Sequence, residues 1–599
     1  MNTGYILAIT RGHNSGACLL KDGKIVFAIE EERLSRQKYD GGPFAAMTKV
    51  LEYTDKIDAL VIAHTQSLEA SAARVDFSGD DIYTGFARKL GLIDRKSNPF
   101  NHPQVVDLST IHHKLHAGCA FYRSGFDDAV AVVVDGAGTF YELSDNTKRS
   151  FMGFEVETIV DCEYPYNLKS LWKHLGTKEN MVTAEAKITL NDPLTGPEEI
   201  DCLISDRAGI VKVYEAVTEY CGFSAIEAGK TMGLFPYGEP NSNIPNLFET
   251  YGDISLSNRN AIIPTYPNSA LLNDRLFSEL KFSESDDLTM LQNRRDMAYA
   301  LQKQTQDEMV KLIRKAVEMT GKTNVVISGG FGLNCVANYH YLEALKDDGI
   351  ELYIEPVSND AGTSIGAALM YYHHTTQSTE KSPADLYLGP AYTYSNEAIK
   401  DIANNNVGIE VTENVKLDDV VDLVANRNIV TIFQGKCENG PRALGNRSII
   451  YDPTDPDGKD FVNSVKNREY FRPFAGSILA EDVHDWFDLR GMDETPHMMY
   501  AVNCRPGIEE KIPSVIHEDG TCRIQTVTQE QNYHYYNIIK AFKDKTGIPM
   551  VFNTSFNLGG DPLVETLDHA IDTLIGSKIE YLYLPENDVL ITVKNAEIV

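Results

Sequence analysis

One pattern occurs twice in the first part of the sequence and limits the folds that are open to the chain. Residues 5–29 predict a short apolar strand, a polar turn that contains glycine, and two returning strands joined by a hairpin turn. Residues 130–160 predict the same order, with the turn at Asp135-Gly136-Ala137-Gly138-Thr139. A strand, a glycine-containing turn and a returning strand can present backbone N–H groups to a phosphate.

Two copies of this pattern in one domain indicate an internally duplicated nucleotide-binding fold of the actin or hexokinase kind. An ordinary β-meander explains the first copy alone equally well. The first turn, residues 10–16, contains His13, and a side chain in such a turn is more often functional or exposed than packed. The charged segment 30–36 predicts the start of a helix, with Arg33 and Arg36 as candidate anion contacts.

The stretch Ile-His-His-Lys-Leu-His at 111–116 contains a pair of histidines with helical spacing. His112 and His116 are four residues apart, so on a helix both imidazoles project from one face, as metal ligands must. Asp135 follows a run of apolar residues that predicts a buried strand, which would deliver a carboxylate at the end of the strand. Two imidazoles and a carboxylate suit a catalytic divalent metal. For an isolated pair, packed structural histidines are the more common explanation.

Two later strands also end in turns that lead into helices. Residues 324–328 predict a buried strand before the glycine-rich turn 329–334, where backbone amides can meet a nucleotide. This turn does not match GxGxxG or the Walker A pattern. Residues 351–355 predict another strand, and Asp360 follows it on the edge where α/β sheets bind ligands. Asp360 is therefore the fourth candidate for the metal site.

Composition and charge exclude several classes of protein. A chain of 599 residues is expected to form two or more domains, and 43% hydrophobic and 24% charged residues are ordinary globular values. The formal charge of -31 disfavours a dominant nucleic-acid surface, although a local basic pocket is compatible with it. The nine cysteines form no CxxC pair. With no signal peptide and no transmembrane stretch in the sequence, we expect a soluble, cytoplasmic protein with reduced thiols.

Four segments have a less specific interpretation. Residues 164–210 carry no clear motif and are interpreted as an insertion or an acceptor-recognition region. In 227–234, Gly229 and Lys230 would allow close approach of a phosphate or ribose, but a packed helix end explains the segment equally well. Residues 286–320 predict a long helix, and 374–396, with their Ser, Thr, Pro and Gly breaks, predict an interdomain linker.

Arginines lie beside Gly and Pro turns in the last third of the chain. They occur in the segments 434–448, 466–474 and 519–525, and Asn553-Thr554-Ser555 follows. Solvated arginines more often sit beside Glu or Asp at helical spacing. In so acidic a chain, this pattern therefore favours an enclosed anion pocket.

Taken together, these segments resemble the NodU/CmcH/TobZ family of O-carbamoyltransferases. In the first part of the chain the matching motifs are GHNSGA, EEERLSR, HHKLHA, VVDGAG, EAGKTMGL, GGFGLN and NDAGTSIGAA; in the second part they are FQGKCENGPRALGNRS, VKNREYFRPFA, DGTCRIQTV and NTSFNLGGDPLV. They occur in the order of the family and cover nearly the whole chain. The departures are residues 164–210 and Gly559-Gly560-Asp561, where Arg-Gly-Glu is more usual, and both leave the acceptor open.

The resemblance implies an α/β fold, α+β overall, with two domains. Residues 1–380 would form a duplicated actin-like (ASKHA) domain similar to the tRNA threonylcarbamoyladenosine transferase, and residues 381–599 a YrdC-like α/β domain. The second domain would make carbamoyl-adenylate from carbamoyl phosphate and ATP, accompanied by Mg²⁺. The first would transfer the carbamoyl group to an acceptor hydroxyl, with Fe(II) or another divalent metal.

The resemblance also assigns roles to residues. It implies that His112, His116, Asp135 and Asp360 hold the metal, that His13 is the general base, and that Lys230, Asn334, Gly330, Gly136 and Gly138 contact the adenylate. It implies that Arg442, Lys466, Arg472, Arg523, Asn553 and Ser555 bind carbamoyl phosphate and ATP, with Lys230, Arg442 and Arg472 taking part in the chemistry beside His13. Fixed Arg and Lys donors suit reactions that gather negative charge.

Three interpretations of function remain open at this point. The first is carbamoyl transfer to a small molecule, a sugar or a hydroxymethylated nucleobase, where a modified nucleotide or DNA base is one alternative acceptor. The second is a threonylcarbamoyl-type tRNA modification enzyme, which the acidic charge disfavours. The third is a non-catalytic actin-like ATP-binding scaffold, which leaves the histidine pair and the arginines unexplained. We expect no membrane partner, and a homodimer is compatible with the sequence.

Overall fold

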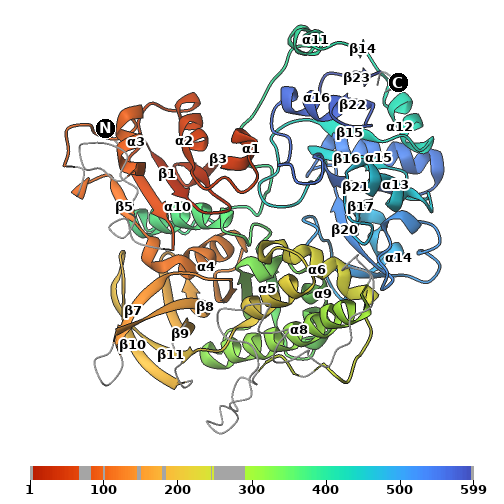
Figure 1. The fold of residues 1–599 in the computed structure, drawn as a ribbon. Helices are drawn as coiled ribbons and strands as arrows, with labels where there is room; N and C mark the ends of the chain where they lie inside the picture. Colours follow the sequence, from red (N-terminus) through yellow and green to blue (C-terminus); the bar gives the residue numbers. More distant parts are fainter. Residues whose placement is uncertain are drawn as a thin grey trace. The chain divides into compact units, whose positions relative to one another are not determined.

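The computed structural model describes residues 4–65, 82–98, 101–144, 150–177, 184–244, 246–248 and 291–594. The chain is a mixed α/β protein that divides into two compact units (Figure 1). The first unit comprises residues 1–31 and 39–384, and the second comprises residues 32–38 and 385–599. Within the described ranges, no helix is both long and apolar enough to cross a membrane.

The first unit contains two sheets. The five-stranded sheet has the order β3-β2-β1-β4-β5, formed by β1 (Tyr5–Thr10), β2 (Gly16–Lys21), β3 (Lys24–Glu30), β4 (Ala59–Ala63) and β5 (Val105–Asp107). Strand β1 is antiparallel to β2 and parallel to β4. The expected hairpin turn joins β2 to β3, and the glycine-containing turn with His13 joins β1 to β2.

The eight-stranded sheet repeats this plan at its centre. Its order is β10-β11-β9-β8-β6-β12-β13, with β7 paired to β8, and its strands are β6 (Asp128–Val134), β7 (Phe140–Ser144), β8 (Ser150–Glu163), β9 (Asn167–Thr177), β10 (Ala184–Asp192), β11 (Gly196–Ser205), β12 (Asn324–Ser328) and β13 (Glu351–Ile354). Strand β6 is antiparallel to β8 and parallel to β12, as β1 is to β2 and β4. In both sheets the first strand therefore lies between an antiparallel hairpin and two parallel strands.

This topology corrects the interpretation of residues 164–210 as an insertion for the part that forms β9, whereas β10 and β11 extend the sheet beyond the repeated plan. Strand β9 is the third strand of the repeated plan and pairs along the length of β8. The sequence of β9 does not show the usual alternation of apolar and polar residues, because the buried polar residues Lys173 and His174 interrupt the apolar pattern. Each of these side chains is paired across the sheet with a buried glutamate, Lys173 with Glu155 and His174 with Glu157, so the strand remains compatible with the core.

Two helices of the first unit pack closely enough to bring distant segments together. The two are α4 and α10. The helices of this unit are α2 (Phe44–Lys49), α3 (Ile82–Leu90), α4 (His112–Arg123), α5 (Ile210–Tyr220), α6 (Ala228–Leu234), α8 (Gln292–Thr320), α9 (Cys335–Ala344) and α10 (Ala361–Thr376). Helices α4 and α10 lie side by side (Figure 1). A Cβ atom on Gly366 would overlap the carbonyl oxygen of Leu115, so only glycine permits this approach. The close contact places the start of α4 beside the start of α10.

Two predicted boundaries differ slightly from the structure. The long helix expected over residues 286–320 is α8, which begins at Gln292, and residues 286–290 lie outside the described ranges. The expected linker at 374–396 overlaps the end of α10, which continues to Thr376. The first unit ends at Ala384.

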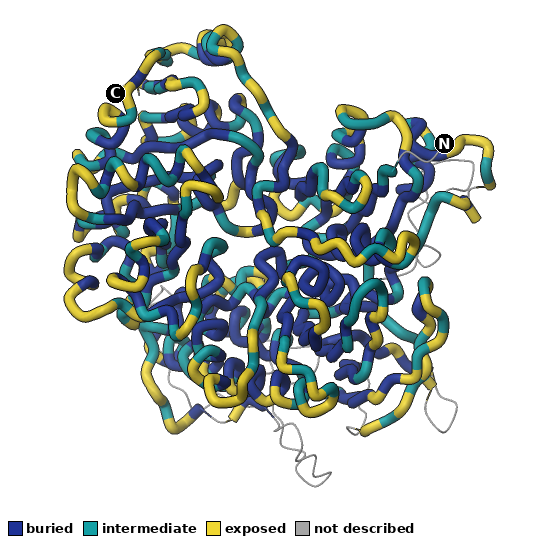
Figure 2. Tube along the Cα trace, turned by 180° about the vertical axis from the view of Figure 1, so that it is seen from behind, coloured by how far each residue is buried: buried dark blue, intermediate teal, exposed yellow. Residues whose placement is uncertain are grey.

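The second unit is built on one mixed sheet of ten strands. Its order is β14-β23-β22-β15-β16-β21-β17-β20-β19-β18, with β14 (Ile409–Glu413), β15 (Val430–Phe433), β16 (Arg447–Tyr451), β17 (Ala475–Leu479), β18 (Phe487–Asp488), β19 (Ala501–Cys504), β20 (Thr521–Val527), β21 (Met550–Ser555), β22 (Tyr581–Leu584) and β23 (Val589–Val593). Its helices are α11 (Asn396–Asn404), α12 (Leu417–Ala425), α13 (Gly458–Val465), α14 (Val483–Trp486), α15 (Tyr533–Thr546) and α16 (Leu567–Ile575). Val424 of α12 and Phe542 of α15 pack with Ile432 of β15 in one core. Figure 2 shows that the central strands of each unit are buried, whereas the connecting segments carry most of the exposed residues.

A short segment from the N-terminal half belongs to the second unit. Residues 32–38, which include most of α1 (Glu31–Ser35), were assigned by sequence to the first domain. The Arg33 guanidinium donates to the carbonyl oxygen of Gly440 at 2.7 Å, and the Arg36 guanidinium donates to that of Leu563 at 2.6 Å. These two arginines, interpreted from sequence as anion contacts, therefore contact backbone carbonyl groups.

Candidate functional site

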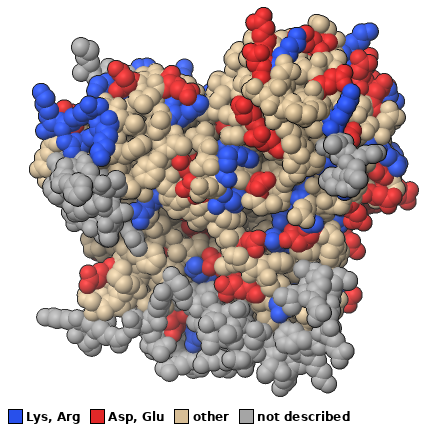
Figure 3. Space-filling model, turned by 45° about the horizontal axis from the view of Figure 1, so that its top comes forward, with Lys and Arg blue, Asp and Glu red and all other residues tan. Residues whose placement is uncertain are grey.

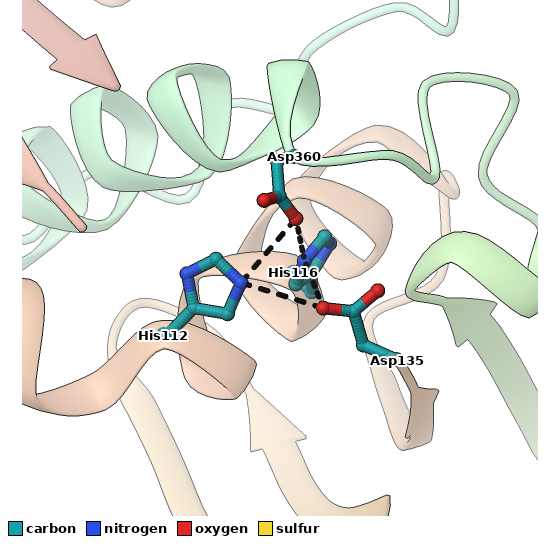
Figure 4. Close-up of side chains that lie close together, drawn as sticks. All are labelled: His112, His116, Asp135 and Asp360. Atoms are coloured by element: carbon teal, nitrogen blue, oxygen red, sulfur yellow. Dashed lines mark ion pairs between the residues drawn. The ribbon is translucent and has the colours of Figure 1, made fainter. Parts of the chain in front are cut away.

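The four predicted metal ligands lie together in the first unit. Their donor atoms are all within 4.8 Å of one another, and we call His112, His116, Asp135 and Asp360 the His/Asp cluster (Figure 4). The Nε2 atom of His112 is 3.4 Å from Asp360 Oδ1 and 3.6 Å from Asp135 Oδ2. His116 Nε2 is 3.4 Å from Asp360 Oδ1 and 3.9 Å from Asp135 Oδ2. Among the described residues, no other such group is found.

Three separate elements deliver these side chains. His112 and His116 lie on one face of the first turns of α4, as their spacing predicted. Asp135 follows the last residue of β6, and the backbone N–H of Gly330 donates to its Oδ1 at 3.0 Å. Asp360 precedes α10, but its carboxylate makes no capping hydrogen bond to that helix. Its side chain is turned toward the histidines instead (Figure 4).

The charges in the cluster are arranged to keep both carboxylates ionised. Burial raises the pKa of Asp360, but His112 and, more weakly, His13 hold it well below its usual range. Burial and Asp360 raise the pKa of Asp135, and the two histidines outweigh them and lower it. Burial lowers the pKa of His112, yet the carboxylates of Asp360 and Asp135 raise it to about 10. The carboxylates therefore supply two negative charges in a water-poor site.

The donor set fits a divalent metal ion. The Nε2 atoms of His112 and His116 are buried and have no hydrogen-bond partner, although they face two carboxylates. Two ligands that each lie about 2.1 Å from one ion are roughly 3 to 3.5 Å apart, and most separations in the cluster are close to this. Ser328 Oγ lies 3.4 Å from His116 Nδ1, where it can orient the ring. Imidazole with carboxylate is a ligand set of transition metals.

The other predicted site residues of the first unit have different surroundings. His13 is exposed in the turn between β1 and β2, and its charge acts on Asp360. Gly138 lies in the turn after β6, where a Cβ atom would be 2.5 Å from Glu155 Oε2. Gly136 lies in the same turn, where a Cβ atom would be 2.8 Å from an oxygen of Glu215.

Lys230 and Asn334 are engaged in contacts within the protein. Lys230 on α6 forms an ion pair of 2.8 Å with Glu227. Asn334 caps α9 through the N–H of Ala337, and its side-chain amide exchanges two hydrogen bonds with Gln302. Their predicted contact with an adenylate stays a prediction.

The second unit brings most of its predicted ligands together around the C-terminal end of the strand β21. Lys466 is buried, and its ammonium group donates to Ser555 Oγ at 3.2 Å and Asn557 Oδ1 at 3.1 Å, as well as to the carbonyl oxygen of Ser555. Asn553 donates to the carbonyl oxygen of Ala443, which anchors the loop that also contains Arg442. The Oδ1 atom of Asn553 is buried without a hydrogen-bond partner.

Positive charges accumulate beside these residues. We call Lys466, Arg468, Arg472 and Arg523 the cation cluster. Burial lowers the pKa of Lys466 well below its usual value, and the charges of Arg468 and Arg472 lower it further. Burial and the neighbours Arg472 and Arg523 lower the pKa of Arg468 to about 9. Like charges repel one another, and the ion pair of 3.5 Å between Arg472 and Glu469 offsets part of this repulsion. A bound anion would make such a cluster more favourable.

Arg468 was not predicted as a site residue from the sequence. Its side chain stacks on Phe474, with the guanidinium carbon 4.9 Å from the ring centroid, and its Nε is buried without a hydrogen-bond partner. The spacing Lys466-x-Arg468-x₃-Arg472 within one loop was visible in the sequence. It could have identified Arg468 as a third cation of the same site.

The surface charges are less uniform than the net charge of -31 suggests. On the face drawn in Figure 3, basic side chains gather in small groups among acidic and uncharged ones. Local basic sites are therefore compatible with an acidic protein, because charges separated by more than about 10 Å are largely screened at ordinary ionic strength.

The folded chain is thus a two-unit α/β protein with a candidate metal site in one unit and a candidate anion site in the other. The family model described as Carbamoyltransferase N-terminus matches residues 65–369, and the model described as Carbamoyltransferase C-terminus matches residues 421–591. The chain belongs to the carbamoyltransferase family. The resemblance found in the sequence is confirmed, and carbamoyl transfer is the general activity that family membership supports.

Relatives of known sequence match over most of the chain. An uncharacterized protein of Synechocystis sp. is 30% identical over 96% of this chain and 95% of its own length. The nodulation protein NolNO of Sinorhizobium fredii is 29% identical over 95% of this chain and 78% of its own length. A crystal structure of full-length HypF in the phosphate- and nucleotide-bound form is 12% identical, covers 62% of this chain and 55% of that chain, and has a TM-score of 0.30. So low a TM-score does not support an inference about fold or function.

Proposed function

We propose that the protein is an ATP-dependent O-carbamoyltransferase with one half-reaction in each unit. The observation that carries the proposal is the His/Asp cluster, in which two buried, unpartnered imidazole nitrogens face two ionised carboxylates. The cation cluster of the second unit supports the other half-reaction. The proposal includes an actin-like fold for the first unit, which the repeated strand order supports, and a YrdC-like fold for the second.

The second unit would form the activated carbamoyl group. Carbamoyl phosphate would react with water to give carbamate and inorganic phosphate. A carbamate oxygen would then attack the α-phosphorus of ATP, so that carbamoyl-adenylate forms and pyrophosphate leaves. Lys466, Arg468 and Arg472 would bind the phosphate oxygens, because fixed cations stabilise the negative charge that both steps accumulate. Mg²⁺ would accompany the ATP phosphates.

The first unit would transfer the carbamoyl group to an acceptor. The hydroxyl oxygen of the acceptor would attack the carbamoyl carbon, its proton would pass to a base, and AMP would leave. His13 is the candidate base, since it is exposed in a turn and interacts electrostatically with Asp360 of the His/Asp cluster, and a neutral imidazole can accept the hydroxyl proton. The N–H groups of the turn that contains Gly136 and Gly138 would bind the adenylate phosphate.

His112, His116, Asp135 and Asp360 would hold a divalent metal, with Fe(II) as the expected ion. Such an ion would supply Lewis-acid polarisation of an oxygen on the bound substrate. The four side chains would hold the ion in place. Water has little access to it from the side of α4, because both histidines are buried there. The acceptor is proposed to be a small molecule, a sugar or a hydroxymethylated nucleobase.

Pyrophosphate release separates this proposal from a non-catalytic scaffold. The full-length protein is incubated with ATP and carbamoyl phosphate, with ATP alone as the control, and pyrophosphate is measured over time. Release that depends on carbamoyl phosphate is expected. No release above the ATP-alone rate would contradict the proposal. A screen of hydroxylated compounds for a gain of one carbamoyl group by mass spectrometry then identifies the acceptor class.

A further inference from the structure

The helix that carries both candidate histidine ligands has no cap of its own. Helix α4 begins at His112, and the first backbone N–H groups of any helix lack partners within the helix. The residue before it, Ile111, provides no capping side chain. The partners come from outside: Thr139 Oγ1 accepts from the N–H of His112 at 3.0 Å, and Glu155 Oε2 accepts from the N–H of His113 at 3.2 Å.

Glu155 connects this helix start to the turn that follows Asp135. The same Oε2 atom accepts from the N–H of Thr139 at 2.9 Å, four residues after Asp135. The backbone of Glu155 also holds the turn, because its carbonyl oxygen accepts from the N–H of Gly138 at 2.9 Å. One carboxylate oxygen therefore holds the backbone beside His112 and the backbone beyond Asp135, which are two of the three segments that build the His/Asp cluster.

The other oxygen of Glu155 is fixed by a buried cation. Lys173 on β9 donates to Oε1 at 2.5 Å, and the hydroxyl of Tyr141 donates to it at 2.9 Å. Glu155 is fully buried, and Lys173 holds its pKa well below the usual range against the effect of burial. Because the pair is neutral as a whole, Glu155 can cap α4 without adding a net negative charge beside the cluster.

We propose that Glu155, with Lys173 as its counter-ion, is a positioning residue that sets the geometry of His112 relative to Asp135 for metal binding. The inference rests on the proposed metal site. Metal ligands must be held to within about 0.5 Å of the geometry that binds the metal. Loss of a residue that supports a ligand typically lowers metal affinity about 10- to 100-fold. Glu155 touches no proposed ligand atom, so its effect passes through the backbone of α4 and of the turn.

The same strand offers a matched control. Glu157, two residues along β8, is equally buried, is paired with His174 at 2.6 Å, and accepts from the N–H of Ile210 at the start of α5 at 2.9 Å. Glu157 thus caps a helix that carries none of the four proposed metal ligands. A register shift in the pairing with β9 lies between the two glutamates.

The test is a titration of the metal-free, full-length protein with Co²⁺, followed by its visible absorption spectrum and by thermal unfolding. Glu155→Gln is expected to weaken Co²⁺ binding about 10- to 100-fold and to change the spectrum. Glu157→Gln is expected to lower the unfolding temperature while binding and spectrum stay as in the wild type. In Glu155→Gln the amide NH₂ group would face the Lys173 ammonium, so adding Lys173→Met is expected to restore affinity to within about threefold of the wild type. If the single variant does not fold, Glu155→Ala combined with Lys173→Met takes its place: it has no side-chain oxygen to accept from the N–H groups of His113 and Thr139, and it is expected to weaken Co²⁺ binding about 10- to 100-fold.

Three results would overturn the inference. Glu155→Gln, or the Glu155→Ala/Lys173→Met variant in its place, could bind Co²⁺ with wild-type affinity and spectrum, or Glu157→Gln could weaken binding as much as Glu155→Gln does. Either result would reject the role of Glu155 and leave the metal site intact. A wild-type protein that binds no Co²⁺ would reject the metal site of the proposed function, and this inference with it.

Discussion

The His/Asp cluster of the first unit and the cation cluster of the second unit balance their charges differently. In the first, two carboxylates lie within 4 Å of two imidazoles, and against the effect of burial they raise the pKa of His112 to about 10. In the second, Lys466 contacts neutral oxygens of Ser555 and Asn557, and the neighbouring arginines repel it. The first cluster therefore contains charges of both signs, whereas the second is mainly positive and would gain favourable electrostatics from a bound anion.

This difference matches the two kinds of ligand that we propose. A resident metal ion stays through many reaction cycles, and a preformed, charge-balanced set of ligands holds it with little rearrangement. Carbamoyl phosphate and ATP must enter and leave in every cycle. The excess positive charge beside Lys466 would attract these anions, although the ion pair of 3.5 Å between Glu469 and Arg472 offsets part of it.

The strongest test of the proposal that each unit carries out one half-reaction is removal of one metal ligand. In His116→Ala, carbamoylation of the acceptor should fall below detection and Co²⁺ affinity should fall at least about 100-fold, because a buried ligand is lost. Pyrophosphate release from ATP and carbamoyl phosphate should stay within about twofold of the wild type. Loss of both half-reactions in a folded variant would show that the two clusters do not act separately.

Removal of the buried lysine should affect the opposite half-reaction. Lys466→Met should reduce pyrophosphate release about 100- to 1000-fold, since one fixed donor to the developing charge is lost. Co²⁺ binding by the first unit is the internal control and should not change. A decrease of less than about tenfold would mean that Lys466 serves the packing of Ser555 and not the reaction.

Arg468, which was not predicted as a site residue from the sequence, should have a smaller effect. Arg468→Gln should raise the KM for carbamoyl phosphate or ATP about 10- to 100-fold, because one charge-assisted contact is lost while the others remain. Arg427→Gln is the matched control, since Arg427 is half-exposed and forms an ion pair of 3.1 Å with Asp455. Equal kinetic constants for the two variants would remove Arg468 from the cation cluster.

The smallest expected effect is a pH dependence of stability. Burial and then Arg468 and Arg472 lower the pKa of Lys466 from its usual value near 10.5. Between the lowered pKa and about 10.5, the folded protein binds fewer protons than the unfolded protein, so the free energy of unfolding contributed by Lys466 rises with pH. Inorganic phosphate would restore the charged form of Lys466, so its binding takes up a proton and tightens as the pH falls.

The measurement is the rise in unfolding temperature caused by phosphate. The rise should be larger at about pH 8 than at about pH 9.5, by an amount that corresponds to roughly 1 kcal/mol or less. Lys466→Met should reduce this difference between the two pH values, and the part contributed by Arg468, with its pKa of about 9, should remain. An equal rise at both pH values in the wild type would show that phosphate does not contact the lysine.

Much of the candidate site could be predicted from local sequence. The spacing of His112 and His116 identified one face of a helix, and the apolar runs before Asp135 and Asp360 identified carboxylates that follow strands. Each prediction needed only the period of a helix or the end of a buried strand. The repeated order of strand, glycine-containing turn and returning strands likewise anticipated the two sheets of the first unit.

Other features depend on pairing between distant segments and have no local pattern. Lys173 and His174 made residues 164–210 look irregular, because a lysine and a histidine in a buried strand are acceptable only when Glu155 and Glu157 lie opposite. Arg33 and Arg36 looked like anion ligands, but their partners are carbonyl oxygens more than 400 residues away in the sequence. Sequence spacing does not show which charge a side chain will meet.

The identity of the secondary structure and of the candidate ligands follows from the sequence, because backbone periodicity and strand ends are local properties. The convergence of these ligands on one point required the folded protein. Close packing of α4 against α10, which Gly366 permits, brings the histidines to Asp360. Glu155, contributed by a different strand, caps α4 where the helix has no cap of its own. Packing and capping by distant residues set distances of 3 to 4 Å in the cluster, and no spacing along the chain specifies such distances.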